Sequence, residues 1–274
     1  GTAIGKSALE TNTTGESNTA MGHIALGNNT SGSNNTGIGR GALNGNIGAD
    51  NNTALGYYAL TTNSTGGGNT AVGRFALYSN TTASTNTAVG YNALYANTTG
   101  TQNTAVGAYA LDAITTGTTS TAVGYQALTA NTASSNTAVG STALATNTTG
   151  AQNSALGHAA LVSNTTGNDN TAIGYTALYS NTTGVQNTSL GKDSLQQNTT
   201  AGSNTGLGYR ALYLNTTGIQ NVAVGSTALD ANTTASYNTA IGHTALGLNT
   251  TGSGNVAVGA YAMEANTTGE SNVS

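Results

Sequence analysis

The three histidines are the first candidates for chemistry, because imidazole groups bind metals and transfer protons near neutral pH. His23, His158 and His243 all stand directly after a glycine that recurs along the chain. The same position holds Lys6 or Tyr57 in other copies, and this variety predicts an exposed column of side chains. The histidines are at least five repeats apart, too far to share one metal ion. We expect no metal site.

The acidic residues and serines also form no catalytic pattern. The nine acidic residues are dispersed without a recurring pair, and no Ser has the His and carboxylate that would activate it. Short Gly-x-Gly pieces, such as Gly37–Gly39 and Gly206–Gly208, belong to the repeat and precede no predicted helix that could bind phosphate. We therefore expect that the chain is not an enzyme and uses no cofactor.

An Asn-x-Ser/Thr sequon recurs once in most copies and allows two interpretations. The side chains could form a stacked Asn/Thr ladder that satisfies the backbone groups of a turn, which we favour. They could instead carry a column of glycans along an exposed loop. The candidate glycosylation sites are Asn12, Asn29, Asn63, Asn80, Asn97, Asn147, Asn164, Asn181, Asn198, Asn215, Asn232, Asn249 and Asn266.

Tyrosines that follow a recurrent Leu are candidate contacts for a carbohydrate or protein receptor, because a phenol offers both an apolar ring and a polar tip. They are also ordinary residues for a strand surface. They include Tyr78, Tyr95, Tyr179 and Tyr213.

Composition narrows the class of protein. Only 5% of the residues are charged and 36% are apolar, with a net charge of −4, whereas disordered chains combine low hydrophobicity with high net charge. There is no Pro, no Cys and no long apolar run, so we expect an ordered chain without disulfides or a membrane span. We expect an extracellular or cell-surface location. Five scattered cations argue against a nucleic-acid partner: Lys6, Arg40, Arg74, Lys192 and Arg210.

Self-similarity at a fixed period dominates the sequence. A Gly recurs every 17 residues from Gly5 to Gly259, with a single step of 16. Sixteen copies and the partial copy Asn272–Ser274 fill residues 1–274, which we interpret as a single repeat array. The shortened copy lacks a residue in Thr132–Ser135, which predicts a loop there. Neither end carries an atypical capping copy, so we expect a segment of a longer fibre.

Each copy reads as one coil of an all-β parallel β-solenoid, or β-roll, of sixteen 17-residue coils. Gly, Asn and Thr disfavour helices. We expect one strand at Asn86–Val89 and its equivalents, a corner at Gly90, and a second short strand at Tyr91–Leu94.

Apolar residues occupy adjacent positions in each predicted strand, as at Ala71-Val72 and Ala76-Leu77. Because neighbours in a strand point to opposite faces, both faces should be buried. We expect Ala to line the inside of the coil, and Val and Leu to face outward onto another copy of the same rod. The alternative is a monomer whose core holds Val and Leu. The candidate oligomer interface comprises Val72, Val89, Val106, Val123, Val139, Leu77, Leu94 and Leu111.

The run Asn86-Thr87-Ala88-Val89-Gly90, with Ala93 three residues further on, resembles the head repeats of YadA-like trimeric autotransporter adhesins, which also occur in bacteriophage tail fibres. The resemblance covers the whole chain, although the family's usual coil is nearer 14 residues. It implies a homotrimer of left-handed parallel β-rolls that displays binding surfaces, located on a cell surface or in a virion tail fibre.

These observations predict a structural or adhesive extracellular fibre segment, a rigid β-solenoid rod for cell-surface adhesion or filament assembly. Its partners would be further copies of itself and a host or surface receptor or glycan. The alternative function is a monomeric β-solenoid module that binds a glycan or ice.

Overall fold

The computed structural model describes the whole chain, Gly1–Ser274, which contains strands and turns but no helix. The chain divides into two compact units, Gly1–Asn136 and Thr137–Ser274. Every strand has three residues. The first unit contains β1 (Thr2–Ile4), β2 (Thr19–Met21), β3 (Thr36–Ile38), β4 (Thr53–Leu55), β5 (Thr70–Val72), β6 (Thr87–Val89), β7 (Thr104–Val106) and β8 (Thr121–Val123). The second unit contains β9 (Thr137–Val139), β10 (Ser154–Leu156), β11 (Thr171–Ile173), β12 (Thr188–Leu190), β13 (Thr205–Leu207), β14 (Val222–Val224), β15 (Thr239–Ile241) and β16 (Val256–Val258).

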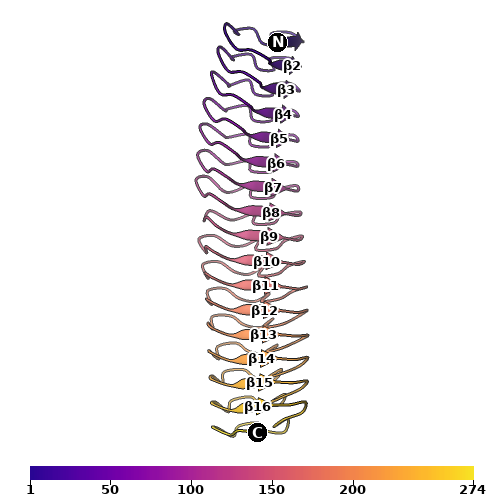
Figure 1. Ribbon diagram of the computed structural model, residues 1–274, viewed down its shortest axis with the longest axis vertical. Helices are drawn as coiled ribbons and strands as arrows, with labels where there is room; N and C mark the ends of the chain where they lie inside the picture. Colours follow the sequence, from indigo (N-terminus) through magenta and orange to yellow (C-terminus); the bar gives the residue numbers. More distant parts are fainter. The chain divides into compact units, whose positions relative to one another are not determined.

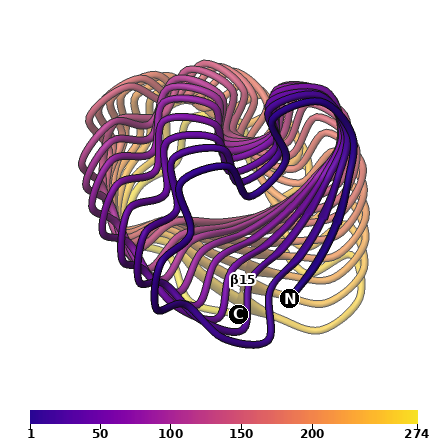
Figure 2. The ribbon, with the colours of Figure 1, turned by 90° about the horizontal axis from the view of Figure 1, so that it is seen from above.

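Within each unit, every strand pairs in parallel with the strand one coil further along (Figure 1). Thr87 pairs with Thr104 in the first unit, and Thr171 with Thr188 in the second. Paired residues are one repeat apart, so equivalent side chains stack directly over one another. Within a unit successive coils have a similar shape and are offset from one another in small steps in the view along the stack (Figure 2). The predicted all-β parallel β-solenoid is confirmed.

The boundary between the units follows the shortened repeat. The loop Thr132–Ser135, where one residue is missing, contains no strand, as the deletion predicted. The first unit ends one residue later, at Asn136. The division into units thus coincides with the one irregularity in the period.

The predicted second strand at Tyr91–Leu94 is wrong, because this segment is a series of turns. Gly90 has a φ of 137°, and Asn92 and Leu94 have left-handed φ values of 55° and 52°. The residues equivalent to Leu94 in all other coils are left-handed too. Left-handed residues reverse the chain within a few residues, so the segment bends around the coil and cannot extend along it.

The turns also explain where the core lies. Ala88 of β6 is fully buried, and so are Ala93 and Leu94 in the turn that follows. The expectation that Leu faces outward is therefore wrong, and Leu77, Leu94 and Leu111 belong to the core and not to an oligomer interface. Neighbours alternate between faces only in extended backbone. At a left-handed residue this alternation is lost, and Ala93 and Leu94 both point inward.

The recurrent Gly is required by the close stacking of the coils. A Cβ on Gly90 would lie 2.6 Å from the carbonyl oxygen of Gly107 in the next coil. The φ of Gly90 is also one that side chains with a Cβ rarely adopt. The positive φ recurs at each equivalent Gly and the close approach at most of them, which accounts for the unbroken glycine period.

Candidate binding surface

Each solenoid unit exposes a face formed by the first and third residues of its strands, which we call the strand face. The first residue is Thr in most strands, and the third is always aliphatic or Met. The third residue is exposed or half-buried in every coil, as at Val89, Leu156 and Val258, which are 36%, 49% and 59% exposed. The outward direction predicted for the Val column is confirmed, and it places the following interface candidates on this face: Val72, Val89, Val106, Val123 and Val139.

The sequon asparagines lie inside the coil, where they form what we call the sequon ladder. Nδ2 of Asn181 donates to Oδ1 of Asn164, 2.9 Å away in the preceding coil, and to the carbonyl of Gly184 at 3.0 Å. Oδ1 of Asn181 accepts in turn from Nδ2 of Asn198 at 2.9 Å. Each amide is therefore held from both sides by its neighbours in the stack.

A second ladder is formed by the asparagines that precede the strands, and we call it the strand ladder. Oδ1 of Asn18 accepts from the backbone N–H of Asn35 in the next coil at 2.9 Å. Its Nδ2 crosses the coil to the carbonyl of Gly32 at 2.7 Å, which also accepts from the sequon residue Asn29 at 2.9 Å. The two ladders thus meet at one carbonyl and close the coil with hydrogen bonds.

This arrangement favours the ladder interpretation of the sequons over the glycan coat. Eleven of the thirteen candidate glycosylation sites are fully buried, and only Asn12 and Asn266 are half-buried. Nδ2, the atom that would carry a sugar, donates within the coil at each of them. A glycan on this atom would displace those hydrogen bonds, so the folded coil disfavours the modification.

The ladders are interrupted only in the first unit. Ile114 takes the place of a sequon-ladder Asn and is fully buried. Because an isoleucine side chain has no donor, Oδ1 of Asn97 in the preceding coil is buried without a hydrogen-bond partner. In the strand ladder Ser120 replaces Asn, and its Oγ accepts from the N–H of Asn136 at a longer 3.3 Å. Both interruptions lie within the last two coils before the unit boundary.

The column after the recurrent Gly contains the histidines and is exposed in most coils, including at all three histidines, as predicted. His158 lies 5.3 Å from the ring of Tyr175, and His243 lies 5.1 Å from that of Tyr261. No group of three or more His, Asp or Glu side chains that could hold a metal ion occurs in the chain.

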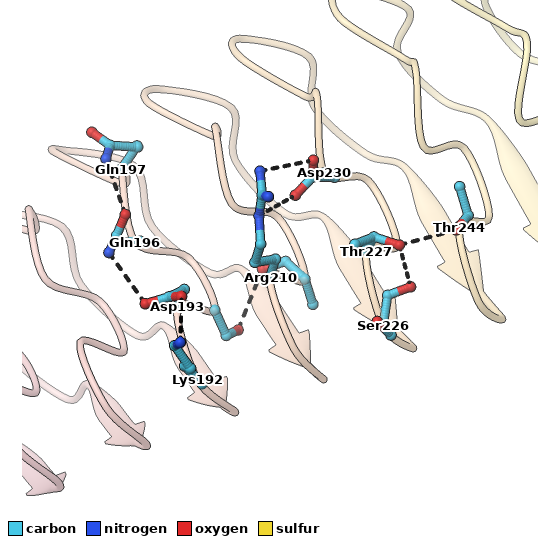
Figure 3. A network of polar contacts seen from close by, with 11 residues as sticks. Lys192, Asp193, Gln196, Gln197, Arg210, Ser226, Thr227, Asp230 and Thr244 are labelled. Atoms are coloured by element: carbon cyan, nitrogen blue, oxygen red, sulfur yellow. Dashed lines mark hydrogen bonds and ion pairs between the residues drawn. The ribbon is translucent and has the colours of Figure 1, made fainter.

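Cations of the second unit are paired with acids (Figure 3). Nε of Arg210 lies 3.2 Å from Oδ1 of Asp230, and Nζ of Lys192 lies 4.0 Å from Oδ2 of Asp193. The guanidinium of Arg210 also lies 4.1 Å from the ring centroid of Tyr213, one of the predicted receptor contacts. Both cations of the second unit thus have an acidic partner.

Two half-buried carboxyl groups have shifted pKa values. Burial raises the pKa of Asp112 above its usual range, against the opposing effect of a hydrogen bond from Oγ1 of Thr129 at 2.6 Å. Burial likewise raises the pKa of Asp230, and the positive charge of Arg210 lowers it in part. Neither carboxyl group has a second acid or a His beside it that would make a catalytic pair.

The first unit carries an aromatic cluster that the sequence analysis did not identify. Phe75 is at its centre, with ring centroids of Tyr57 at 5.6 Å, Tyr78 at 5.4 Å and Tyr95 at 6.3 Å. The rings of Tyr78 and Tyr95 stack at 5.2 Å with an interplanar angle of 9°. A sequence signal existed, because seven of the thirteen Tyr and the single Phe fall within residues 57–125. Of the predicted receptor contacts, Tyr78 and Tyr95 thus come together here.

The chain contains no helix long and apolar enough to cross a membrane. No protein-family model matches the sequence, and no curated protein matches it.

Proposed function

We propose that the chain is a structural and adhesive segment of an extracellular fibre, in which copies of the chain associate through their strand faces. The observation that carries this proposal is the column of exposed or half-buried aliphatic side chains that each unit presents in every one of its coils. Ladders of parallel strands and buried asparagines make the coil rigid. A rigid coil with an apolar face is suited to assembly into a fibre.

The size of the strand face supports association between copies. Eight coils stacked at ~4.8 Å and strands three residues wide give a face of about 34 Å by 10 Å in each unit, or roughly 340 Å². The face of one unit is therefore less than half of the ~800 Å² that each partner buries in a standard protein interface, so both units would have to contribute to a stable interface. The aliphatic column makes up only part of this face, beside the Thr column, and association between copies would cover its exposed side chains. A homotrimer, the state implied by the family resemblance, would cover this face.

The mass in solution tests the proposal. We expect light scattering to give a multiple of the 26.8 kDa chain mass. Replacing Val89, Val106 and Val123 together by Asp should shift the mass toward that of a single chain, because charges would be buried in the interface. The matched control places Asp at three exposed aliphatic residues away from the strand face, Ile47, Val185 and Ile219. A monomeric parent chain would contradict the proposal.

One observation favours a second candidate, a monomeric module that binds ice or a glycan. Thr and aliphatic side chains form two regular parallel columns on the strand face, and the Thr residues are exposed or half-buried. A repeating array of hydroxyl and methyl groups could order water or contact a repeating ligand. Thermal hysteresis of a monomeric sample would support ice binding, and its absence would exclude it.

A further inference from the structure

The first unit contains two arginines that no acid neutralises. The chain has only two ion pairs within 4.0 Å, and both belong to the second unit. Arg40 and Arg74 are exposed and have no carboxylate within that distance. A guanidinium group presents a rigid fork of donors that matches a carboxylate or sulfate group. These two side chains are therefore free to bind an anion from outside.

Aromatic rings hold both guanidinium groups in place. The Cζ atom of Arg74 lies 4.7 Å from the ring centroid of Phe75, 5.6 Å from that of Tyr57 and 5.8 Å from that of Tyr91. Cζ of Arg40 lies 6.0 Å from the centroid of Tyr57. Cation–π contacts at these distances restrict the arginine side chains and reduce the entropy that binding would cost.

The aromatic cluster gives the arginines a surface suited to sugars. Tyr57, Tyr91 and Tyr95 are 41%, 38% and 36% exposed. Each phenol offers a hydroxyl group for hydrogen bonds with sugar hydroxyls, and exposed ring carbon for the C–H groups of a sugar. The surface contains no pocket, so it suits an extended polymer better than a compact ligand.

The spacing of the charges agrees with a linear polymer. Arg40, Tyr57, Arg74 and Tyr91 occupy the same position in four successive coils, so cation and phenol alternate along the stack. At ~4.8 Å per coil, the two arginines are about 10 Å apart. A polymer lying along this column would place one anionic group on each guanidinium and neutral sugar surface between them.

The charge of the unit argues against a nucleic-acid ligand. A phosphate backbone requires many cations, because each nucleotide carries a charge. Three cations against four acids give the first unit a formal charge of −1, from Lys6, Arg40, Arg74, Glu10, Glu16, Asp50 and Asp112. Two localised cations suit a ligand whose charges are widely spaced.

We propose that Arg40, Arg74 and the surrounding tyrosines form a binding site for an extended acidic polysaccharide, whose carboxylate or sulfate groups pair with the two guanidinium groups. The site gives a ligand class to the adhesive part of the proposed function and rests on it. Assembly through the strand face is measured separately, because the arginines stand two residues beyond the aliphatic column of that face.

Binding of the full chain to immobilised polysaccharides tests the site. Alginate supplies carboxylates, dextran sulfate supplies sulfates and dextran is the neutral control. We expect binding to alginate or dextran sulfate that weakens as salt is added, with the tighter of the two identifying the anionic group. Dextran and single-stranded DNA should bind at least tenfold more weakly. Equal binding of dextran, equal binding of DNA, or no binding of either acidic polysaccharide would overturn the proposal.

Substitutions locate the binding on the chain. The double variant R40Q/R74Q should weaken binding by about tenfold or more, since hydrogen bonds to charged groups are lost. The matched control is K192Q/R210Q, which removes the same charge from the second unit, where the cations already have acidic partners. Equal weakening in both variants would indicate a general charge effect and contradict the site. Light scattering on every variant reports assembly separately, so loss of binding and loss of the fibre are distinguishable.

Discussion

The first and second units are built from the same coil, yet they differ both in the regularity of the interior and in the pairing of surface charges. In the second unit both ladders contain Asn in every coil, and the cations pair with acids on the surface. In the first unit Ile114 and Ser120 interrupt the ladders, and two arginines stand without acidic partners among aromatic rings. The second unit therefore has the more regular interior, and the first unit has surface cations that lack acidic partners.

This contrast shows which columns of the coil can vary. An interior amide needs a donor or acceptor from the coils on either side, so one replacement leaves a buried atom unsatisfied, as at Asn97. A surface side chain can form hydrogen bonds with water instead, so it does not need a matching residue in the neighbouring coils. Differences in ligand binding are therefore expected on the surface columns, while the interior preserves the fold.

The largest effect is expected from breaking the regular ladder of the second unit. Asn181→Ala removes three side-chain hydrogen bonds and leaves the buried Oδ1 of Asn164 without its donor. We expect a loss of about 3 kcal/mol in the free energy of unfolding, measured by urea denaturation. Thr183→Ala is the control, because it destroys the same sequon at an exposed residue. It should change stability by less than about 0.5 kcal/mol. A larger loss in the control would point to the hydroxyl, or to a glycan that needs the sequon.

The same substitution in the first unit should cost less. Asn97 donates to Oδ1 of Asn80 and to the carbonyl of Gly100, both at 3.0 Å, but its own Oδ1 has no partner. Asn97→Ala therefore loses one hydrogen bond fewer than Asn181→Ala, and we expect a loss smaller by about 1 kcal/mol. Equal losses in the two urea titrations would show that the interruption at Ile114 does not weaken the ladder.

A smaller effect should distinguish the ion-paired surface charges of the second unit from the unpaired charges of the first. Arg210→Gln removes the ion pair with Asp230 and leaves a half-buried carboxylate without its cation, and we expect it to destabilise the chain by about 0.5 kcal/mol, with the difference decreasing in high salt. Asp112→Asn removes a carboxylate that has no cationic partner, so no comparable loss should follow. A salt-independent loss at Arg210 would mean that packing, and not charge, is the contribution of that side chain.

The smallest effect is the pH dependence due to Asp112. Burial raises the pKa of Asp112 in the folded chain, so the folded state takes up a proton at a pH where the unfolded state is still ionised. Stability contributed by this group should therefore rise as the pH falls from neutral through the raised pKa toward the usual carboxyl pKa. Relative to Asp112→Asn, the wild type should gain stability between pH 7 and pH 4. A relative loss in denaturation curves over that range would reverse the sign.

Much of the coil could be predicted from the sequence, because stacked residues must repeat at the period of the coil. The 17-residue step gives the strand register directly, and strand alternation places Ala88 inside and Val89 outside. The position of Leu94 could not be predicted in this way. A left-handed backbone is unusual for Leu, and the sequence alone does not reveal that burial in the core compensates for it.

The proposed binding surface could be predicted only in part from the sequence. Residues of different coils, such as Arg74 and Tyr57 or Phe75 and Tyr95, come together only when the turns of successive coils are folded. The clustering of aromatic residues in one part of the chain was visible in the sequence. Their grouping with unpaired guanidinium groups depended on the three-dimensional arrangement.

In-register stacking has a consequence for how such a chain could evolve. Where both ladders are unbroken, as in the second unit, removal or duplication of a whole 17-residue segment leaves strand partners and amide partners unchanged in kind, because each coil contacts equivalent residues above and below. Slippage during replication of the repeated gene would therefore alter the number of coils without creating a misfolded product. The number of coils in the second unit could therefore change in single steps without altering Arg40 or Arg74, which belong to the first unit.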